Sequence, residues 1–333
     1  MIKNLWYGIL DSKEIKKDRI TGVTRLGLNL ALWRSYDNKV HCVFDKCCHR
    51  GASLSHGKLI KCDSNCRVEC PFHGFQYDGS GKVQSIPANG KNTPVPERYH
   101  VNSFHVEDKY GFIWLWNGEN LGDETSLYPE IPFFKYLREG FSYGGFSENW
   151  NVHYTRAVEN QLDVVHLPFV HTNTIGRGNR TLVNGPVIEW EENLMTFYVD
   201  NQLDDGKTTP LKPDEIKNYK EMFSLQFQMP NIWQNRISDN LRIVAVFAPV
   251  DAENTRIYLR FYQNFVKVPG LKQLVNWFSN FSNGVILHQD RAVVLRQLPK
   301  ETELRMNENL IQGDAPIIEF RKRRELLIEG MQK

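Results

Sequence analysis

The sequence contains no long hydrophobic run and carries almost no net charge. No stretch approaches the ~20 consecutive apolar residues that a membrane-spanning helix needs, and the formal net charge is +2. This balance gives no case for a nucleic-acid partner or an anionic membrane surface. The first ten residues, MIKNLWYGIL, have neither the length nor the flanks of a signal peptide. We therefore expect a soluble, cytoplasmic protein.

Cysteine is also scarce, and the chain shows no internal repeat or low-complexity segment. Six cysteines in 333 residues are too few for a disulfide scaffold. The length exceeds that of an average domain, so two domains are expected. Hydrophobic residues make up 41% of the chain and aromatic residues 12%, which is enough for two packed cores.

Four potential metal ligands stand in two short motifs. Cys47 and His49 form a Cys-x-His motif, and after residues 50–69 Cys70 and His73 form a Cys-x-x-His motif. Two thiolates and two imidazoles can hold a Rieske [2Fe–2S] cluster, with both cysteines on one iron and both histidines on the other. The neutral imidazoles raise the reduction potential above that of an all-cysteine cluster. A glycine follows each motif, and we expect it to let the loop approach the cluster and to donate its amide to the sulfurs.

Structural zinc is the main alternative to a cluster. Zinc fingers, however, usually pair cysteine with cysteine and histidine with histidine, whereas each motif here contributes one of each. Four such residues in this order are also unlikely to be only buried thiols and structural histidines. Cys62 and Cys66 lie between the motifs as spectators, a labile disulfide or a small metal clip, and we favour spectators.

The first part of the chain, residues 1–118, alternates short apolar segments with turns. Residues 28–33 and 112–116 are apolar, aromatic and bounded by Gly or Asn, as strands are. Residues 78–81, DGSG, are a strong turn signal. We predict a small antiparallel β domain with the metal loops at one end, closed by the turn residues at 117–118.

The second part, residues 119–333, has a mixed pattern. Several segments read as strands: 187–199, 224–234, 241–249 and 256–266. Others read as helices: 155–167, which should stop near Pro168, 271–281, 285–298 and 317–329. Strands flanked by long helices in this order predict an α+β domain with helices on one face of an antiparallel sheet.

The predicted helix 155–167 leads to a second candidate metal site. Glu159, Asp163 and His166 are spaced i, i+4 and i+7, so they would share one helix face. The break at Pro168 could return His171 to the side of His166. Two neutral imidazoles are good ligands for Fe(II), and one carboxylate would complete a facial triad with open positions for O₂ and substrate.

Asp290 is the best candidate for that carboxylate. It is the one acid in the apolar segment 288–294, and a carboxylate near a core must be paired or bound to a metal. The alternative is a salt bridge to Arg291 or Arg296. A lone histidine pair is also more often structural than metal-binding. The predicted cluster shifts the balance, because a one-electron carrier needs an acceptor for its electrons.

These motifs together resemble the catalytic α subunits of the Rieske non-haem iron oxygenases. The two boxes, the Asp-x-x-His-x-x-x-x-His pattern at 163–171 and the Gln-Asp at 289–290 carry the resemblance, which covers the whole chain. It implies a Rieske domain over residues 1–118 and a helix-grip (Bet v1-like) catalytic domain with an antiparallel sheet over 119–333. The implied cluster ligands are Cys47, His49, Cys70 and His73, and the implied iron ligands are His166, His171 and Asp290.

Asp163 then resembles the acid that links an iron-ligating histidine to a histidine of a neighbouring subunit's cluster, and Asn160 belongs to the same catalytic segment. The alternative for Asp163 is an ion pair with Arg156. The length and this segment look most like the homotrimeric branch typified by vanillate O-demethylase and pheophorbide oxygenase, which points to monooxygenation. Two features depart from the family pattern: the gap between the boxes is longer, and Cys48 stands where many members have Pro.

The resemblance implies an oxygenase component that takes electrons from NAD(P)H through a separate ferredoxin and/or flavin reductase. With O₂ it would hydroxylate or demethylate a hydrophobic, ring-containing molecule; cis-dihydroxylation of an aromatic ring is the alternative. A Rieske electron carrier or a zinc-stapled binding protein are the alternatives from other classes. The expected pocket residues, for which plain core packing is an equal alternative, are Phe223, Phe227, Met229, Trp233 and Val285.

Overall fold

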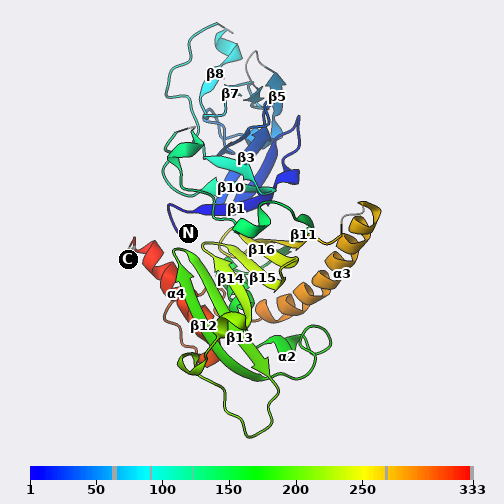
Figure 1. The fold of residues 1–333 in the computed structure, drawn as a ribbon. Coiled ribbons are helices and arrows are strands. Elements are labelled where there is room, and N and C mark those ends of the chain that lie inside the picture. Colours follow the sequence, from blue (N-terminus) through cyan, green and yellow to red (C-terminus); the bar gives the residue numbers. More distant parts are fainter. Residues whose placement is uncertain (62–65, 91, 123, 267–268, 331–333) are drawn as a thin grey trace. The chain divides into compact units, whose positions relative to one another are not determined.

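The computed structural model describes residues 1–61, 66–90, 92–122, 124–266 and 269–330 (Figure 1). The chain divides into two compact units, Asn4–Ile131 and Met1–Lys3 with Pro132–Lys333. The expected domain division after residue 118 lies earlier than this one. Residues beyond 118 pack with the first unit because the Tyr128 ring stacks on His105 at 3.7 Å between centroids and Pro129 O accepts from Trp6 Nε1 at 2.8 Å.

The first unit contains three antiparallel sheets, as the short apolar segments and turns predicted. Their strand orders are β1-β10-β9, β2-β3-β4 and β5-β6-β7-β8. The strands are β1 Trp6–Asp11, β2 Thr21–Arg25, β3 Leu28–Arg34, β4 Val40–Phe44, β5 Lys58–Lys61, β6 Cys66–Glu69, β7 Gln76–Tyr77, β8 Val83–Ser85, β9 Val106–Lys109 and β10 Phe112–Trp116. Short 3₁₀ helices join them: η1 Ser12–Glu14, η2 Leu54–His56, η3 Pro87–Asn89 and η4 Thr125–Leu127.

The predicted turn at 78–81 lies between β7 and β8. Gly81 N donates to Asp78 O at 3.1 Å, and the Asp78 side chain accepts from Ser80 N at 2.9 Å. Gly81 has φ +81°, a conformation that residues with a Cβ rarely adopt. The turn thus returns the chain to pair β8 with β7, beside the second Cys-His loop.

The second unit is built on a seven-stranded antiparallel sheet in the order β11-β17-β16-β15-β14-β13-β12. The strands are β11 Ser142–Trp150, β12 Leu182–Glu191, β13 Leu194–Gln202, β14 Phe223–Gln228, β15 Ile232–Ser238, β16 Leu241–Pro249 and β17 Thr255–Gln263. The helices are α1 Tyr154–Leu162, α2 Leu167–Val170, α3 Pro269–Val294 and α4 Ala315–Ile328, with 3₁₀ helices η5 Lys135–Leu137, η6 Pro213–Glu215, η7 Tyr219–Glu221 and η8 Gln312–Asp314. Helix α1 contacts β16, α3 and α4. This large antiparallel sheet with few helices confirms the expected α+β class.

Several element bounds differ from the sequence-based expectation. The segments 187–199 and 224–234 are not single strands but contain hairpin turns, at Glu192 with φ +50° and at Pro230, which has no N–H for a ladder. The expected helices 271–281 and 285–298 are one continuous helix, α3.

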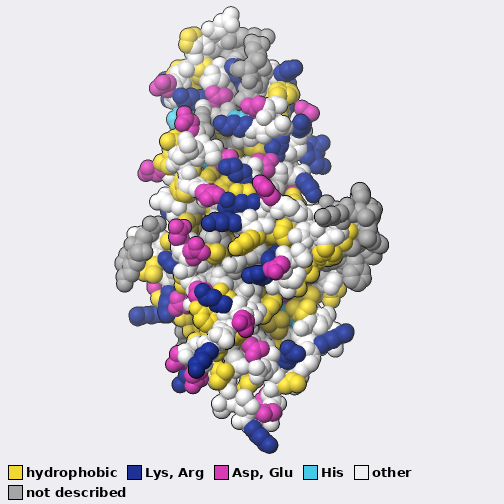
Figure 2. All heavy atoms as spheres, viewed as in Figure 1, with side chains coloured by type: hydrophobic (Ala, Val, Ile, Leu, Met, Phe, Trp, Pro, Cys, Tyr) yellow, Lys and Arg dark blue, Asp and Glu magenta, His cyan; other side chains and the backbone are white. Residues whose placement is uncertain are grey.

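Cys62 lies outside the described residues, and Cys66 is buried at the start of β6. No helix among the described residues is both long and apolar enough to cross a membrane. Figure 2 shows basic and acidic side chains interspersed over the visible face, in keeping with the near-zero net charge.

Candidate metal centres and substrate cavity

The two Cys-His motifs form loops with the same backbone hydrogen bonds. Cys47 N donates to Ala52 O at 2.7 Å and Gly51 N donates to Cys47 O at 2.9 Å. In the second loop Cys70 N donates to Phe75 O at 2.8 Å and Gly74 N to Cys70 O at 3.1 Å. The glycine amides therefore close each turn on the cysteine carbonyl, not on a sulfur as the sequence suggested. Gly51 and Gly74 are required for conformation, because their φ angles are +76° and +72°.

The four candidate cluster ligands differ in how deeply their side chains are buried. The Cys47 and Cys70 side chains are buried, whereas His49 and His73 are exposed at the loop tips. The two imidazole rings lie edge to face with centroids 4.6 Å apart, and His49 stacks on Phe75 at 4.8 Å. Two buried thiols below two adjacent imidazoles suit a cluster whose sulfur-ligated iron is inside and whose histidine-ligated iron faces outward.

Tyr77 is a residue of this site that the sequence did not reveal. Its hydroxyl lies 3.0 Å from Cys47 Sγ and 3.2 Å from Cys48 Sγ, and it accepts from Cys48 N at 3.1 Å. Burial, with the nearby thiols adding to it, raises the pKa of Tyr77, so the hydroxyl keeps its proton and can donate to a thiolate. A tyrosine three residues past a Cys-x-x-His-Gly box is the signal that could have found it.

The candidate iron site starts where α1 ends. Asp163 is the residue at the C-terminus of α1, and its Oδ1 accepts from Val165 N at 2.7 Å and His166 N at 3.2 Å. The predicted helix 155–167 is thus too long. Pro168 sits in the first turn of α2 and starts this helix, where its missing N–H costs nothing. Glu159 points elsewhere: its carboxylate accepts from Arg321 at 2.8 Å.

Three predicted ligands meet in this site. The ligating atoms of His166, His171 and Asp290 all lie within 4.8 Å of one another. Asp290 Oδ1 is 3.4 Å from His166 Nε2 and 3.0 Å from His171 Nε2. The Asp290 side chain, on α3, is 4% exposed and has no arginine partner among the described residues, because Arg291 pairs with Glu148 at 2.6 Å and Arg296 donates to Ala292 O. The alternative that Asp290 forms a salt bridge with Arg291 or Arg296 is therefore wrong.

The other nitrogen of each imidazole faces a side-chain oxygen. His171 Nδ1 lies 2.8 Å from Gln289 Oε1, a hydrogen bond that leaves Nε2 as the ligating atom. His166 Nδ1 is 3.5 Å from Asp163 Oδ2, an ion-pair distance but a poor hydrogen bond. Asp163 therefore contacts His166, and the alternative pairing with Arg156 is wrong, since Arg156 pairs with Glu159 and Glu308.

Two amides of α1 complete the surroundings of the carboxylate. Asn160 Nδ2 donates to Asp290 Oδ1 at 3.3 Å, and Gln161 Nε2 lies 3.5 Å from Asp290 Oδ2. Gln161 also donates to Asn160 Oδ1 at 2.9 Å, which fixes both amides. Gln161 and Gln289 were missed by the sequence analysis, because a helical position alone does not say which side chain reaches a residue of another helix.

The charges of this site act on one another strongly. Burial by itself would lower the pKa of His166, but the carboxylates of Asp163 and Asp290 outweigh it and raise that pKa to about 9. Burial would raise the pKa of Asp290, yet the two histidines hold it below its usual range. A buried carboxylate that favours the positively charged form of His166 also favours a metal ion bound at the same place. The donor set of two imidazoles and one carboxylate fits Fe(II) and leaves coordination positions open.

The three ligands lie on the wall of a cavity of about 940 Å³. One side is formed by α1, α2 and α3, and the other by one face of strands β13 to β17. Along β16 the lining residues alternate, Ile243, Ala245 and Phe247, as expected for a strand with one face toward the cavity. The cavity is large enough for a small ring-containing molecule.

Of the five expected pocket residues, only Phe223 and Trp233 line this cavity. Phe227 lies on the same strand face as Phe223 but is covered by α4, where its ring meets Phe320 at 5.3 Å. Met229 is fully buried at the end of β14, in the core.

Val285 is 39% exposed, because the face of α3 toward the cavity carries Asn283, Ile286 and Leu287 instead. The expectation was therefore wrong for Phe227, Met229 and Val285.

The two units together define a class of protein with a Rieske-type cluster loop pair and a separate mononuclear metal site. The family comparison agrees: residues 5–105 match the Rieske [2Fe-2S] domain, and residues 150–330 match the vanillate O-demethylase oxygenase C-terminal domain. The chain belongs to the Rieske oxygenase α subunits of this vanillate O-demethylase type. Rieske domains bind a [2Fe–2S] cluster, and this family uses a mononuclear iron at its catalytic site.

Relatives and solved structures extend this similarity over the chain. Chlorophyllide a oxygenase of Chlamydomonas reinhardtii is 32% identical over 53% of this chain and 26% of its own length. Methylxanthine N1-demethylase NdmA of Pseudomonas putida is 24% identical over 96% of this chain and 88% of its own. The chain spans between 26% and 60% of the length of the first four curated relatives.

Two solved structures have the same fold. The structure of NdmA from Pseudomonas putida superimposes with a TM-score of 0.75 at 23% identity, covering 97% of this chain and 90% of that one. Dicamba monooxygenase bound to dicamba gives a TM-score of 0.76 at 19% identity, covering 99% and 98%.

Proposed function

We propose that this chain is the oxygenase component of a Rieske non-haem iron system. It uses O₂ and electrons from an NAD(P)H-dependent reductase, directly or through a ferredoxin, to hydroxylate or demethylate a small ring-containing molecule. The observation that carries this proposal is the meeting of His166, His171 and Asp290 on the wall of a cavity of about 940 Å³. A pure electron carrier needs no such cavity.

The residues take the following roles in this proposal. Cys47, His49, Cys70 and His73 hold the cluster, and His166, His171 and Asp290 hold the iron. When bound, the two groups supply single electrons and activate O₂ for insertion into a C–H bond. Each turnover takes one O₂, two electrons and two protons, and gives a hydroxylated product and water; a hydroxylated O- or N-methyl group then leaves as formaldehyde.

The surrounding residues hold this site in place. Asn160 and Gln161 orient the Asp290 carboxylate from α1, and Gln289 fixes the His171 ring. The apolar side chains of β16 and β17 exclude water from the cavity, which favours reaction of the substrate over loss of reactive oxygen. Asp163 contacts His166 and links it to a partner's cluster in a homotrimer.

Monooxygenation is preferred over dihydroxylation of a ring. The names of two similar proteins, methylxanthine N1-demethylase and dicamba monooxygenase, both describe that kind of chemistry. We assign the catalytic domain to residues 119–333. A cytoplasmic location remains a prediction from the sequence.

Metal content and O₂ uptake test this function. We expect three irons per chain, a red-brown colour, and O₂ uptake that a surrogate reductase and a substrate library stimulate. Asp290→Ala should lose the mononuclear iron and the O₂ uptake but keep the cluster spectrum. Asp204 is an exposed acid of the same unit, and Asp204→Ala should keep the iron, the O₂ uptake and the cluster spectrum. Zinc in place of iron, or an active Asp290→Ala protein, would contradict the proposal.

A further inference from the structure

Besides Nδ1 of the metal-site residue His166, two polar atoms on residues of the cavity wall have no hydrogen-bond partner among the described residues. They are Nε1 of Trp233 and Oδ1 of Asn235, and both atoms are buried. The two residues are two positions apart on β15, so their side chains lie on the same face of the sheet, and both line the cavity. Trp233 is 5% exposed as a whole residue. A buried donor and a buried acceptor thus lie on neighbouring residues of one strand face, and neither has a partner in the described part of the chain.

The neighbours of these residues explain why no internal partner is available. In the sheet register Trp233 lies between Phe227 and Ala245, and Asn235 between Leu225 and Ile243. These four cross-strand neighbours offer no side-chain donor or acceptor. Gln226 and Gln234, on the opposite face of the same strands, do bond each other at 2.7 Å.

Other unpartnered indoles occur in the protein, but not at the cavity. Trp33 and Trp150 also have an unbonded Nε1, and neither lines the cavity. Unsatisfied buried polar groups are uncommon in folded proteins, so an unpartnered donor and acceptor on two neighbouring residues of the cavity wall point to a ligand.

The chemistry of the two groups defines what that ligand must carry. An indole N–H can only donate, so the group that faces Trp233 is an acceptor such as a carbonyl oxygen. The carbonyl oxygen of the Asn235 side chain accepts, so the group that faces it is an N–H or O–H donor. The remaining sheet residues of the wall are mostly apolar. Arg177 and Arg180, which also contribute to the lining, are exposed side chains.

We propose that Trp233 and Asn235 are the specificity-determining residues of the cavity, and that they select an uncharged ring compound with a hydrogen-bond acceptor beside a donor, as in a cyclic amide. This inference rests on the proposed function, whose substrate class it narrows from hydrophobic rings in general. A bare hydrocarbon ring would bury both groups without partners and bind poorly for that reason.

Binding of three bicyclic probes of nearly equal shape tests this selection. 2-Quinolinone carries an acceptor and a donor, coumarin only the acceptor, and naphthalene neither. Dissociation constants are measured by equilibrium dialysis on the iron-loaded protein under anaerobic conditions, so that no turnover occurs. The variants are Trp233→Phe and Asn235→Leu, with Trp190→Phe on β12, away from the cavity, as the control.

We expect the wild-type protein to bind 2-quinolinone more tightly than coumarin, and coumarin more tightly than naphthalene. Each hydrogen bond should contribute about fivefold or more to the ratio of dissociation constants. Trp233→Phe should remove the preference for coumarin over naphthalene, and Asn235→Leu the preference for 2-quinolinone over coumarin. Trp190→Phe should leave both ratios unchanged. Because ratios within one variant are compared, a general weakening of the cavity does not imitate the effect.

Two outcomes would overturn the inference. One is that the ratios are the same in the wild-type protein and in both cavity variants. The other is that the anionic probe 2-naphthoate binds tightest and loses its affinity in Arg177→Gln or Arg180→Gln, which assigns recognition to the arginines. Failure of the proposed function is distinguishable from failure of this inference. If the protein binds the probes as expected but shows no substrate-stimulated O₂ uptake, the inferred specificity of the cavity stands and the proposed oxygenase function is wrong.

Discussion

At the residue scale, the metal ligands are set by contacts that orient each side chain. The His171 ring is buried, and the hydrogen bond between its Nδ1 and Gln289 Oε1, at 2.8 Å, sets how the ring is turned. Gln289 is in turn steadied by Thr174, whose Oγ1 lies 3.2 Å from the same oxygen. A partner of this kind fixes the tautomer and orientation of a metal-bound histidine.

Replacing Gln289 should therefore weaken the iron site without changing its ligands. Gln289→Leu removes the acceptor at similar size, and we expect Fe(II) affinity to fall about 10- to 100-fold. Gln289→Glu keeps an acceptor at the same place and should retain most of the affinity. Anaerobic titration with Fe(II) or Co(II) measures this, and the cluster absorbance serves as the internal control. Full metal affinity in Gln289→Leu would show that His171 is positioned by its backbone alone.

The metal ligands could be predicted from the sequence, but the residues that form hydrogen bonds with these ligands could not. Asp290 was identified because an acid in an apolar helix segment needs a metal or a partner. Tyr77, Gln161 and Gln289 are polar residues of ordinary type, and only the folded chain shows that they reach Cys47, Asp290 and His171. For the same reason, the sequence could name aromatic pocket candidates but not separate Trp233 from the core residue Phe227.

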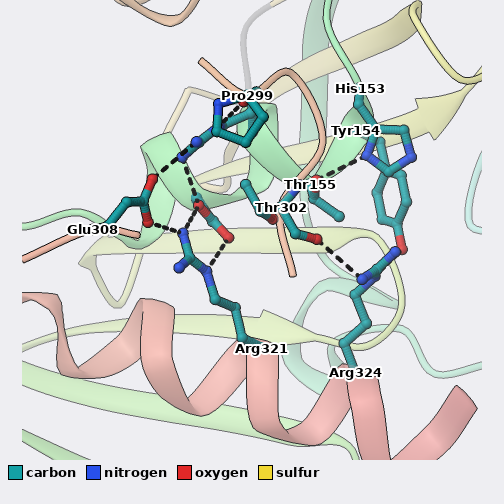
Figure 3. A network of polar contacts seen from close by, with 10 residues as sticks. His153, Tyr154, Thr155, Pro299, Thr302, Glu308, Arg321 and Arg324 are labelled. Atoms are coloured by element: carbon teal, nitrogen blue, oxygen red, sulfur yellow. Dashed lines mark hydrogen bonds and ion pairs between the residues drawn. The ribbon is translucent and has the colours of Figure 1, made fainter. Parts of the chain in front are cut away.

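At the scale of elements, helix α1 is held to α4 by a group of two arginines and two glutamates, of which Arg156, Glu159 and Arg321 are buried and Glu308 is half-buried (Figure 3). Arg321 donates to Glu159 through Nε and through Nη2, each at 2.8 Å, and its Nη2 forms an ion pair with Glu308 at 2.8 Å. Arg156 reaches the same two acids at 3.4 and 2.9 Å. Since Glu159 directly precedes Asn160, this group also holds the α1 segment whose amides contact Asp290.

Breaking this group should destabilise the second unit strongly. Arg321→Met leaves Glu159 buried with less compensation, and we expect a loss of about 3–5 kcal/mol in the free energy of unfolding. The double variant Arg321→Met/Glu159→Gln removes the uncompensated charge and should recover part of the loss. Lys322→Met, which removes only an exposed pair with Glu319, should change stability by less than about 1 kcal/mol. Calorimetry checks all three; equal effects at Arg321 and Lys322 would contradict this role.

The start of α1 carries a pH-sensitive residue of a different kind. His153 is buried just before the helix, and its Nδ1 lies 2.8 Å from Thr155 Oγ1. Burial, opposed by Glu301 and assisted by Arg324, lowers the pKa of His153 to about 4. The unfolded chain takes up the proton near pH 6.5 and the folded one does not. Its stabilising effect is therefore present above pH 6.5 and is lost as the pH falls toward 4.

We expect this histidine to cost the protein about 2 kcal/mol of stability between pH 7 and pH 5. His153→Gln keeps a polar side chain without that titration, so its unfolding temperature should fall less over this range than that of the wild-type protein. His288→Gln, whose side chain is 66% exposed, is the control and should fall as the wild type does. Parallel curves for the wild-type protein and His153→Gln would show that other groups cause the acid sensitivity.

Element types followed from sequence patterns more reliably than element ends. β16 was predicted with its observed bounds, Leu241–Pro249, because its apolar run is long and ends at a proline. The apolar segments 187–199 and 224–234 each hide a hairpin turn, since the residues on both sides of the turn are equally apolar. Helix α1 was predicted too long, because the periodic pattern continues past Leu162 while the Asp163 side chain turns the chain there.

At the scale of the whole molecule, the order of the two units along the chain was predictable from the motifs, because both Cys-His motifs precede the Asp-x-x-His-x-x-x-x-His pattern at 163–171 in the sequence. The oligomeric state could not be derived from the motifs, because it depends on surface residues that belong to no motif. The proposed homotrimer can be tested through function. In a ring, every subunit meets its neighbour through the same contact, so an iron in one chain can receive electrons from a cluster in the next.

Mixed trimers of two inactive variants separate transfer within a chain from transfer between chains. A Cys70→Ser chain keeps a working iron site and a His166→Ala chain keeps a working cluster, so each homotrimer should be inactive. With random equal mixing, half of the sites have an intact iron and half of those adjoin an intact cluster, so about a quarter of the wild-type activity should return. Adding Asp163→Ala to the Cys70→Ser chain should abolish this recovery even with both metals loaded, because Asp163 contacts the iron-ligating His166. Adding Asp204→Ala, an exposed acid, should not. If verified mixed trimers stay inactive, electrons travel within one chain, and the linking role of Asp163 is wrong.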